Sequence, residues 1–138
     1  MSAMERTAWF ELIVSVVALA TVTALYPWLG NGAVGAFGIL GLLGGAYWFL
    51  RRSGPGVTVD ERDRAIDLKA RFAGVTAGWQ VLLLTLIGIV LVSDYRGAKQ
   101  VPLSLIVWLV FLQGAICYGV KGLVGVLSYR RQSRAAQG

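Results

Sequence analysis

Four long apolar stretches alternate with short polar segments along this chain. They cover about 8–29, 32–50, 75–92 and 103–127. Glu11 is the only ionised side chain in the first stretch, and only Gln113 and Lys121 interrupt the last. About 20 apolar residues cross a hydrocarbon core of roughly 30 Å as a helix. Because backbone N–H and C=O groups in lipid must bond within their own segment, each stretch is predicted to be a transmembrane helix.

The connections between these stretches are unequal in length and polarity. A short uncharged turn at 27–32 contains Pro27 and Asn31, which disfavour continued helix. A second short turn covers 96–102, whereas the long segment 51–74 carries most of the polar residues. The pattern therefore predicts an all-α fold: an integral membrane four-helix bundle of two hairpins, forming a single transmembrane domain over residues 1–138.

The composition excludes most soluble and catalytic classes of protein. Hydrophobic residues make up 57% of the chain and charged residues 14%, with a mean hydropathy of +0.67, whereas soluble domains carry roughly 25% charged residues. The chain has no His, and its single Cys, Cys117, can form neither an internal disulfide nor a thiolate cluster. We therefore expect no enzymatic activity, no metal and no cofactor.

The distribution of basic residues predicts the orientation in the membrane. Of the 13 Lys and Arg residues, only Arg96 and Lys99 lie in the turn between the third and fourth stretches; the others lie near the termini or in 51–74. Under the positive-inside rule, both termini and the loop 51–74 are cytoplasmic. The net charge of +6 is thus mainly a topology signal. No aromatic and basic binding face accompanies it, so we expect no direct nucleic-acid binding.

The central loop contains a predicted short amphipathic helix that leads into the third span. Asp60 is a good N-cap residue, and acids follow it in the first turn. Asp67 and Arg71 lie four residues apart, a spacing that supports an exposed helix. Two interpretations remain open: an interfacial helix whose charges are solvated, or a docking surface for a cytoplasmic protein.

Residues 60–70 carry the string Asp-Glu-Arg-Asp-x-x-Ile-x-x-Lys-Ala. This string resembles the signature of an uncharacterised family of small prokaryotic four-span membrane proteins, classed as a domain of unknown function. The resemblance implies a protein of the prokaryotic inner membrane with no assigned activity, whose gene often lies beside that of a small helix-turn-helix regulator. The candidate partner-binding residues are Asp60, Glu61, Arg62, Asp63, Ile66 and Lys69.

A few polar residues lie inside the predicted spans. Glu11 is about one helical turn below the cytoplasmic surface and Lys121 about 10 Å below it. Gln80 is on the same inner side, and Gln113 is nearer the midplane. We expect these four to form a polar cluster facing the bundle interior, either as structural contacts between helices or as part of an ion or proton path. The outer half is almost wholly apolar, which favours the structural role.

Glycine is abundant, with 18 in the chain. The second stretch holds Gly32, Gly35, Gly38, Gly41, Gly44 and Gly45. Gly41 with Gly45, and Ala115 with Gly119, have the small-xxx-small spacing that permits close helix packing. This predicts a compact bundle, and leaves open whether some of the close contacts join copies in a homo-oligomer.

Three classes of function remain. The first is a non-catalytic membrane protein whose cytoplasmic loop helix docks or sequesters a soluble protein, such as a small helix-turn-helix regulator. The alternative is a small oligomeric channel, transporter or transporter accessory subunit. A membrane enzyme ranks last, since neither His nor an interfacial pocket of clustered acids is evident.

Overall fold

The computed structural model describes residues 3–44, 60–97 and 100–135, and the regular structure in these ranges is entirely helical. The elements are α1 (Ala3–Leu29), the 3₁₀ helix η1 (Gly30–Leu42), α3 (Glu61–Arg96) and α4 (Leu103–Ala135). Three helical segments are long and apolar enough to cross a membrane: Met4–Leu42, Glu61–Arg96 and Leu103–Ala135. The prediction of an all-helical membrane protein is thereby confirmed.

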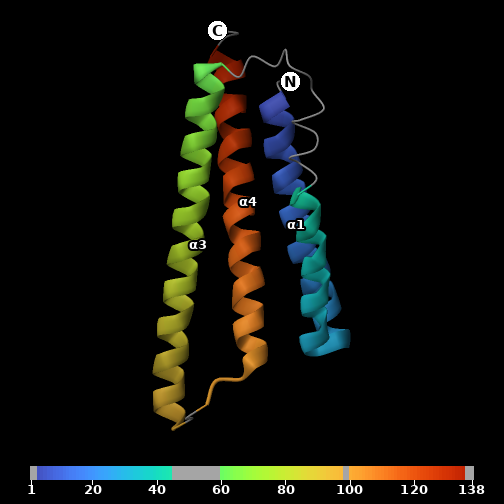
Figure 1. Ribbon diagram of the computed structural model, residues 1–138, viewed down its shortest axis with the longest axis vertical. Coiled ribbons are helices and arrows are strands. Elements are labelled where there is room, and N and C mark those ends of the chain that lie inside the picture. The colour runs from blue at the N-terminus through green and yellow to red at the C-terminus, as the bar shows by residue number, and fades with distance from the viewer. Residues whose placement is uncertain (1–2, 45–59, 98–99, 136–138) are drawn as a thin grey trace.

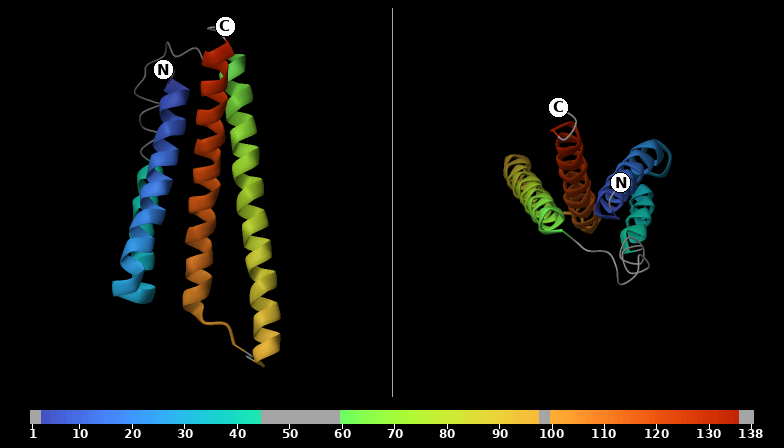
Figure 2. Two further views of the ribbon diagram at one scale, coloured as in Figure 1. Left: turned by 180° about the vertical axis from the view of Figure 1, so that it is seen from behind. Right: turned by 90° about the horizontal axis from the view of Figure 1, so that it is seen from above.

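The helices form an open arc, in contrast to the predicted closed four-helix bundle. Helix α4 lies in the centre and packs against α3 on one side and α1 on the other, while η1 packs mainly against α1 (Figures 1 and 2). The start of α1, the start of α3 and the end of α4 lie together at one end of the molecule (Figure 1). Much of the apolar surface of α3 is consequently left without a protein neighbour in the described part of the chain.

The predicted second span corresponds to η1 and differs from expectation. Its 13 residues form a 3₁₀ helix, which at a rise of roughly 2.0 Å per residue is about 26 Å long. Residues 45–50 of the predicted span lie outside the described residues. The prediction of four spanning helices is therefore not supported: the described residues contain three helices of sufficient length and apolarity.

The glycines of η1 follow its helical period. A 3₁₀ helix has about 3.0 residues per turn, so glycines at every third position lie on one face. These are Gly32, Gly35, Gly38 and Gly41, all exposed. The close packing predicted at Gly41 is wrong, because a Cβ built there meets nothing within 4 Å. The opposite side of η1 is buried instead, through Ala33 and Phe37.

The first turn begins later than predicted. Helix α1 continues through Pro27 to Leu29, and the chain changes direction at Gly30, whose φ is +52°. Proline lacks only one intrahelical hydrogen bond, and Pro27 is exposed near the helix end, where that loss disturbs little. A positive φ is unstrained for glycine, and Gly30 therefore sets the turn.

The predicted amphipathic segment is the first part of α3. The helix begins at Glu61 and runs unbroken to Gly97, whose φ of +63° ends it. Asp60 occupies the N-cap position, but its carboxylate makes no capping hydrogen bond; its carbonyl oxygen accepts the N–H of Arg64 at 3.1 Å. The predicted amphipathic segment and the predicted third span thus form one continuous helix.

Glycines on α3 and α4 bring the helix backbones close together. On α3, Gly74 and Gly78 are buried against α4. On α4, Gly122 is buried against α1, where an added Cβ would lie 2.6 Å from the backbone nitrogen of Leu12. Gly74 and Gly122 have no room for a larger side chain, whereas a Cβ at Gly78 would make ordinary contacts. The close approaches at Gly74 and Gly122 therefore fix α4 between its two neighbours.

An aromatic cluster holds η1 against α1 and α4, away from the charged end. Phe37 is 1% exposed, stacks on Phe111 with ring centroids 5.8 Å apart, and meets Trp108 edge to face at 5.9 Å. Ala18 and Val22 of α1 belong to the same core. Such packing anchors η1 through one large side chain.

We predict that Gly74→Ala destabilises the protein by about 1–3 kcal/mol, because the added Cβ collides with the backbone carbonyl oxygen of Cys117 and forces α3 away from α4. The matched control is Gly88→Ala on the same helix, where a Cβ meets nothing within 4 Å. Unfolding of the purified protein in detergent measures both variants. Equal stability of the two would contradict the close α3–α4 contact.

Candidate functional site

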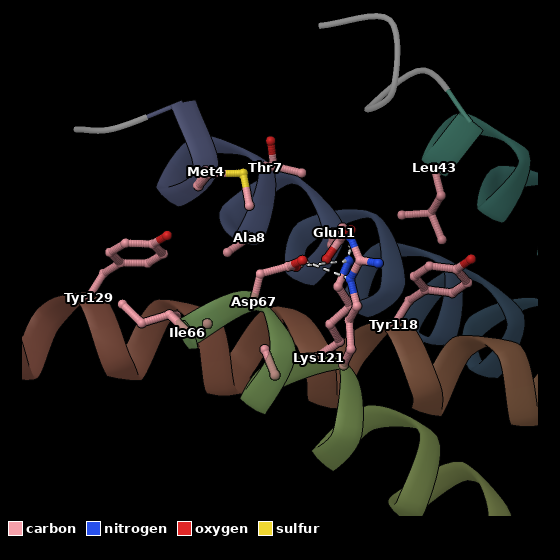
Figure 3. Close-up of a pocket in the computed structure, with 13 residues that line it drawn as sticks. Met4, Thr7, Ala8, Glu11, Leu43, Ile66, Asp67, Tyr118, Lys121 and Tyr129 are labelled. Atoms are coloured by element: carbon pink, nitrogen blue, oxygen red, sulfur yellow. Dashed lines mark hydrogen bonds and ion pairs between the residues drawn. The ribbon is translucent and has the colours of Figure 1, made fainter. Parts of the chain in front are cut away.

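A concave site lined by charged residues is a groove between α1 and α3, with α4 as its floor, at the end where α1 and α3 begin. Its volume is about 260 Å³. Its polar lining comes from three helices and comprises Thr7, Glu11, Asp67, Arg71, Tyr118, Lys121 and Tyr129 (Figure 3). Leu43, which follows η1, closes one side.

Lys121 is the centre of this groove and links three helices. Its Nζ donates a hydrogen bond to Oε1 of Glu11 on α1 at 2.5 Å, and lies 3.9 Å from Oδ1 of Asp67 on α3. The side chains of Glu11 and Lys121 are only 9% and 17% exposed. Charges so shielded from water are stable only when paired and hydrogen-bonded. We call Glu11, Asp67 and Lys121 the charge hub.

Glycines bring the three helices close enough for the side chains of the charge hub to meet. Lys121 precedes Gly122, which lies against the backbone of α1 at Ala8 and Leu12, and this contact brings Glu11 within reach of the ammonium. On the other side, Gly74 lies against the backbone and Cβ of Lys121, one helical turn from Ala70 and two from Asp67. The same close approach that fixes α4 therefore also positions the ion pairs.

Arg71 completes the polar lining at the rim. Its Nε pairs with Oδ2 of Asp67 at 2.8 Å, four residues earlier on the same helix, as the spacing predicts. The Arg71 side chain is 65% exposed, so water screens this pair and its contribution to stability is small. Its effect is mainly to hold the carboxylate of Asp67 in place beside Lys121.

Two further contacts join the helices beyond the hub, toward the helix ends. The hydroxyl of Tyr129 on α4 donates to Oδ1 of Asp63 on α3 at 3.0 Å. The guanidinium of Arg130 lies 5.1 Å from the ring centroid of Trp9 on α1, a cation–π distance. Helix α4 is thus attached to both neighbours above the groove as well as within it.

The structure brings together only part of the predicted intramembrane cluster. Glu11 and Lys121 pair directly. Gln80 is exposed on α3, and Gln113 is half-buried, with its side chain near Gly78. Sequence reasoning missed Asp67, because the third span was predicted to begin at residue 75 and Asp67 was assigned to the loop.

The six candidate partner-binding residues divide into two groups. Ile66 is 6% exposed and lines the groove, and Asp63 is half-buried and accepts the Tyr129 hydroxyl. Asp60, Glu61, Arg62 and Lys69 are exposed. The first group therefore contacts the groove and α4, and only the second group lies on the exposed surface.

The groove contains equal numbers of acidic and basic side chains. Two acids, Glu11 and Asp67, face two bases, Lys121 and Arg71. One turn further into α1, the hydroxyl of Ser15 is fully buried and has no hydrogen-bond partner within the described ranges. The described residues contain no group of three or more Cys, Asp or Glu that could hold a metal ion. The paired acids and bases of the groove thus join side chains from α1, α3 and α4.

Comparisons of the chain with family models, with curated proteins and with solved structures found no match.

We predict that Lys121→Met destabilises the protein by about 3–5 kcal/mol, because the buried Glu11 carboxylate loses its cation. Adding Glu11→Leu should recover much of the loss, since the pair is then replaced by apolar groups. Arg71→Met, at an exposed position, should cost at most about 1 kcal/mol. A double-mutant cycle on detergent-solubilised protein measures these terms. A Lys121→Met variant as stable as the parent would show that the charge hub does not stabilise the fold.

Proposed function

We propose that the chain is a non-catalytic polytopic membrane protein whose cytoplasmic helix ends dock or sequester a soluble protein. The observation that carries this proposal is the length of two helices. At roughly 1.5 Å per residue, the 36 residues of α3 extend about 54 Å and the 33 residues of α4 about 50 Å. A hydrocarbon core is roughly 30 Å thick, so about 20 Å of each helix lies outside it.

The additional length is at the charged end of the molecule. At the other end of α3, exposed apolar side chains continue to Val92 and the helix stops at Arg96. Helix α4 likewise begins with apolar residues at Leu103 and ends among Arg130, Arg131 and Arg134. The two helices therefore project together from the side where α1 begins.

The projecting ends of α3 and α4 form a rigid surface on which a partner could bind. The Tyr129–Asp63 hydrogen bond joins α3 and α4 within it, and the charge hub holds its base. Asp60, Glu61, Arg62 and Lys69 are exposed on it, and we name these four the docking residues. A fixed helix that carries both charge signs favours one charge pattern on a partner over others. The resemblance of residues 60–70 favours a small helix-turn-helix regulator as that partner.

We also propose a four-span topology of two hairpins in a prokaryotic inner membrane, with both termini and the segment 51–74 cytoplasmic. In support, η1 runs back alongside α1, and its length of about 26 Å is close to a hydrocarbon thickness (Figure 1). The basic residues also concentrate at the end where α1 and α3 begin and α4 ends.

The channel or transporter alternative has weaker support. The ionisable residues of the groove lie at one end of the helices, and they are already paired with one another. Beyond Ser15 along α1, the buried side chains are Ala18 and Val22. A conducting route needs polar groups or water through the full depth.

The docking proposal predicts that a photo-crosslinking side chain at Arg62, in intact cells, captures a soluble protein. The matched control is the same group at Arg96, an exposed arginine at the opposite end of the same helix, which should capture none. Charge reversal by Glu61→Lys with Lys69→Glu should reduce capture at Arg62 severalfold, because the charge pattern is inverted. Equal capture at both positions, or capture that survives the reversal, contradicts the proposal.

The topology proposal predicts opposite labelling of the two helix ends by an impermeant thiol reagent. In a Cys117→Ala background, Asn31→Cys and Gln100→Cys should react in intact cells, whereas Ser133→Cys should react only after permeabilisation. All three positions are exposed, so protection reports the membrane side. Protection of Asn31→Cys in intact cells would show that α1 and η1 do not form an outward-facing hairpin.

A further inference from the structure

Gln80 is a polar amide in the middle of an otherwise apolar surface of α3. Exposed large apolar side chains follow this helix from Phe72 to Val92. At roughly 1.5 Å per residue, the two ends of this surface are about 30 Å apart, and Gln80 lies about 12 Å from the first end and about 18 Å from the second. The amide is therefore near the midplane of the membrane, where water is absent.

The side chain of Gln80 points away from the other helices. The residues of α3 buried against α4 include Gly74 and Gly78, and Gln80 follows Gly78 by two residues, a rotation of about 200°. It is separated by about 220° from Asp67, which faces the groove beside α1. In the described ranges, Gln80 is exposed and no hydrogen bond to its amide is found.

The surface around Gln80 has the composition of a helix contact in membranes. Ala73 and Ala77 are four residues apart, and so are Thr76 and Gln80. Small residues allow a second helix to approach closely, and side-chain amides form hydrogen bonds across such contacts. We name these four residues the Gln80 face.

We propose that the Gln80 face binds the same face of a second copy of this chain, forming a two-fold symmetric dimer through α3. A glutamine amide carries both a donor and an acceptor, so two copies of Gln80 satisfy each other across a two-fold axis. Copies inserted in the same orientation present Gln80 at the same depth. Lipid tails offer no hydrogen bond to an amide that has no other partner. Helix α3 lies at one end of the open arc, so the Gln80 face is accessible to a second copy (Figure 2).

Repulsion between basic side chains of the two copies favours helices that cross at an angle over helices that run side by side. Arg62 and Lys69 lie 18 and 11 residues before Gln80, and therefore on nearly the same side of α3 as Gln80. Like charges at this side repel across a dimer axis. Lys69 is about 16 Å and Arg62 about 27 Å from Gln80 along the helix, so helices that cross at Gln80 diverge before either pair of like charges meets.

The first test is dimer dissociation of the full chain in detergent micelles, measured by energy transfer between labelled copies. Gln80→Leu should weaken the dimer roughly 5- to 30-fold, which corresponds to the hydrogen-bond contributions measured between membrane helices. Gln80→Asn retains the amide and should dimerise nearly as the parent does. Gln113→Leu removes an amide from the contact between α3 and α4, and should leave the dissociation constant unchanged.

The second test is disulfide cross-linking in native membranes with Cys117→Ala as background. Thr76→Cys, one turn from Gln80, should form a disulfide between copies under mild oxidation. Leu86→Cys is 43% exposed in the parent but lies about 120° around the helix from Gln80, and should not. A monomeric parent, an undiminished Gln80→Leu dimer, or equal cross-linking at the two positions would each overturn the proposal.

Discussion

The charged end of this protein depends on one ammonium group held between two helices that otherwise pack little against each other. Lys121 extends from α4 to Glu11 on α1 and approaches Asp67 on α3. Because the pair is shielded from water, neither charge is stable without the other, and the relative positions of three helices are coupled to one side chain. Attachment of α3 and α1 to a shared central helix explains how an open arc, rather than a closed bundle, keeps a defined groove.

That ammonium reaches its partners only because glycines allow the backbones to approach. Gly122, next to Lys121, allows α1 to approach, and Gly74, two turns from Asp67, allows α3 to approach. Apolar surface alone gives little preference for one helix arrangement in lipid, since the lipid tails are equally apolar. The glycines allow close packing of the helix backbones, and the ion pairs of the charge hub then favour one rotation of each helix about its axis. The two effects are therefore complementary, and neither fixes the arrangement alone.

The sequence predicted the features that depend on position along a helix, and missed those that depend on rotation about it or on helix type. Counting residues from the predicted surface placed Glu11 and Lys121 at similar depth, and the two do pair. Asp67 was missed because apolarity, not helicity, set the predicted start of the third span. Gln80 was expected among the polar residues of the bundle interior, but a two-residue offset from Gly78 turns it outward. At Gly41, composition suggested close packing, whereas the 3₁₀ winding turns that residue to the open side.

The 3₁₀ winding of η1 also changes how much membrane thickness a short segment can match. Thirteen residues wound as an α-helix would be about 20 Å long, whereas the same residues in η1 extend about 26 Å, a length that otherwise needs about 17 α-helical residues. Hydrophobic mismatch carries a cost for every ångström of uncovered hydrocarbon. A tighter coil with a glycine at every third position thus gives a short stretch of chain a length close to the thickness of a hydrocarbon core.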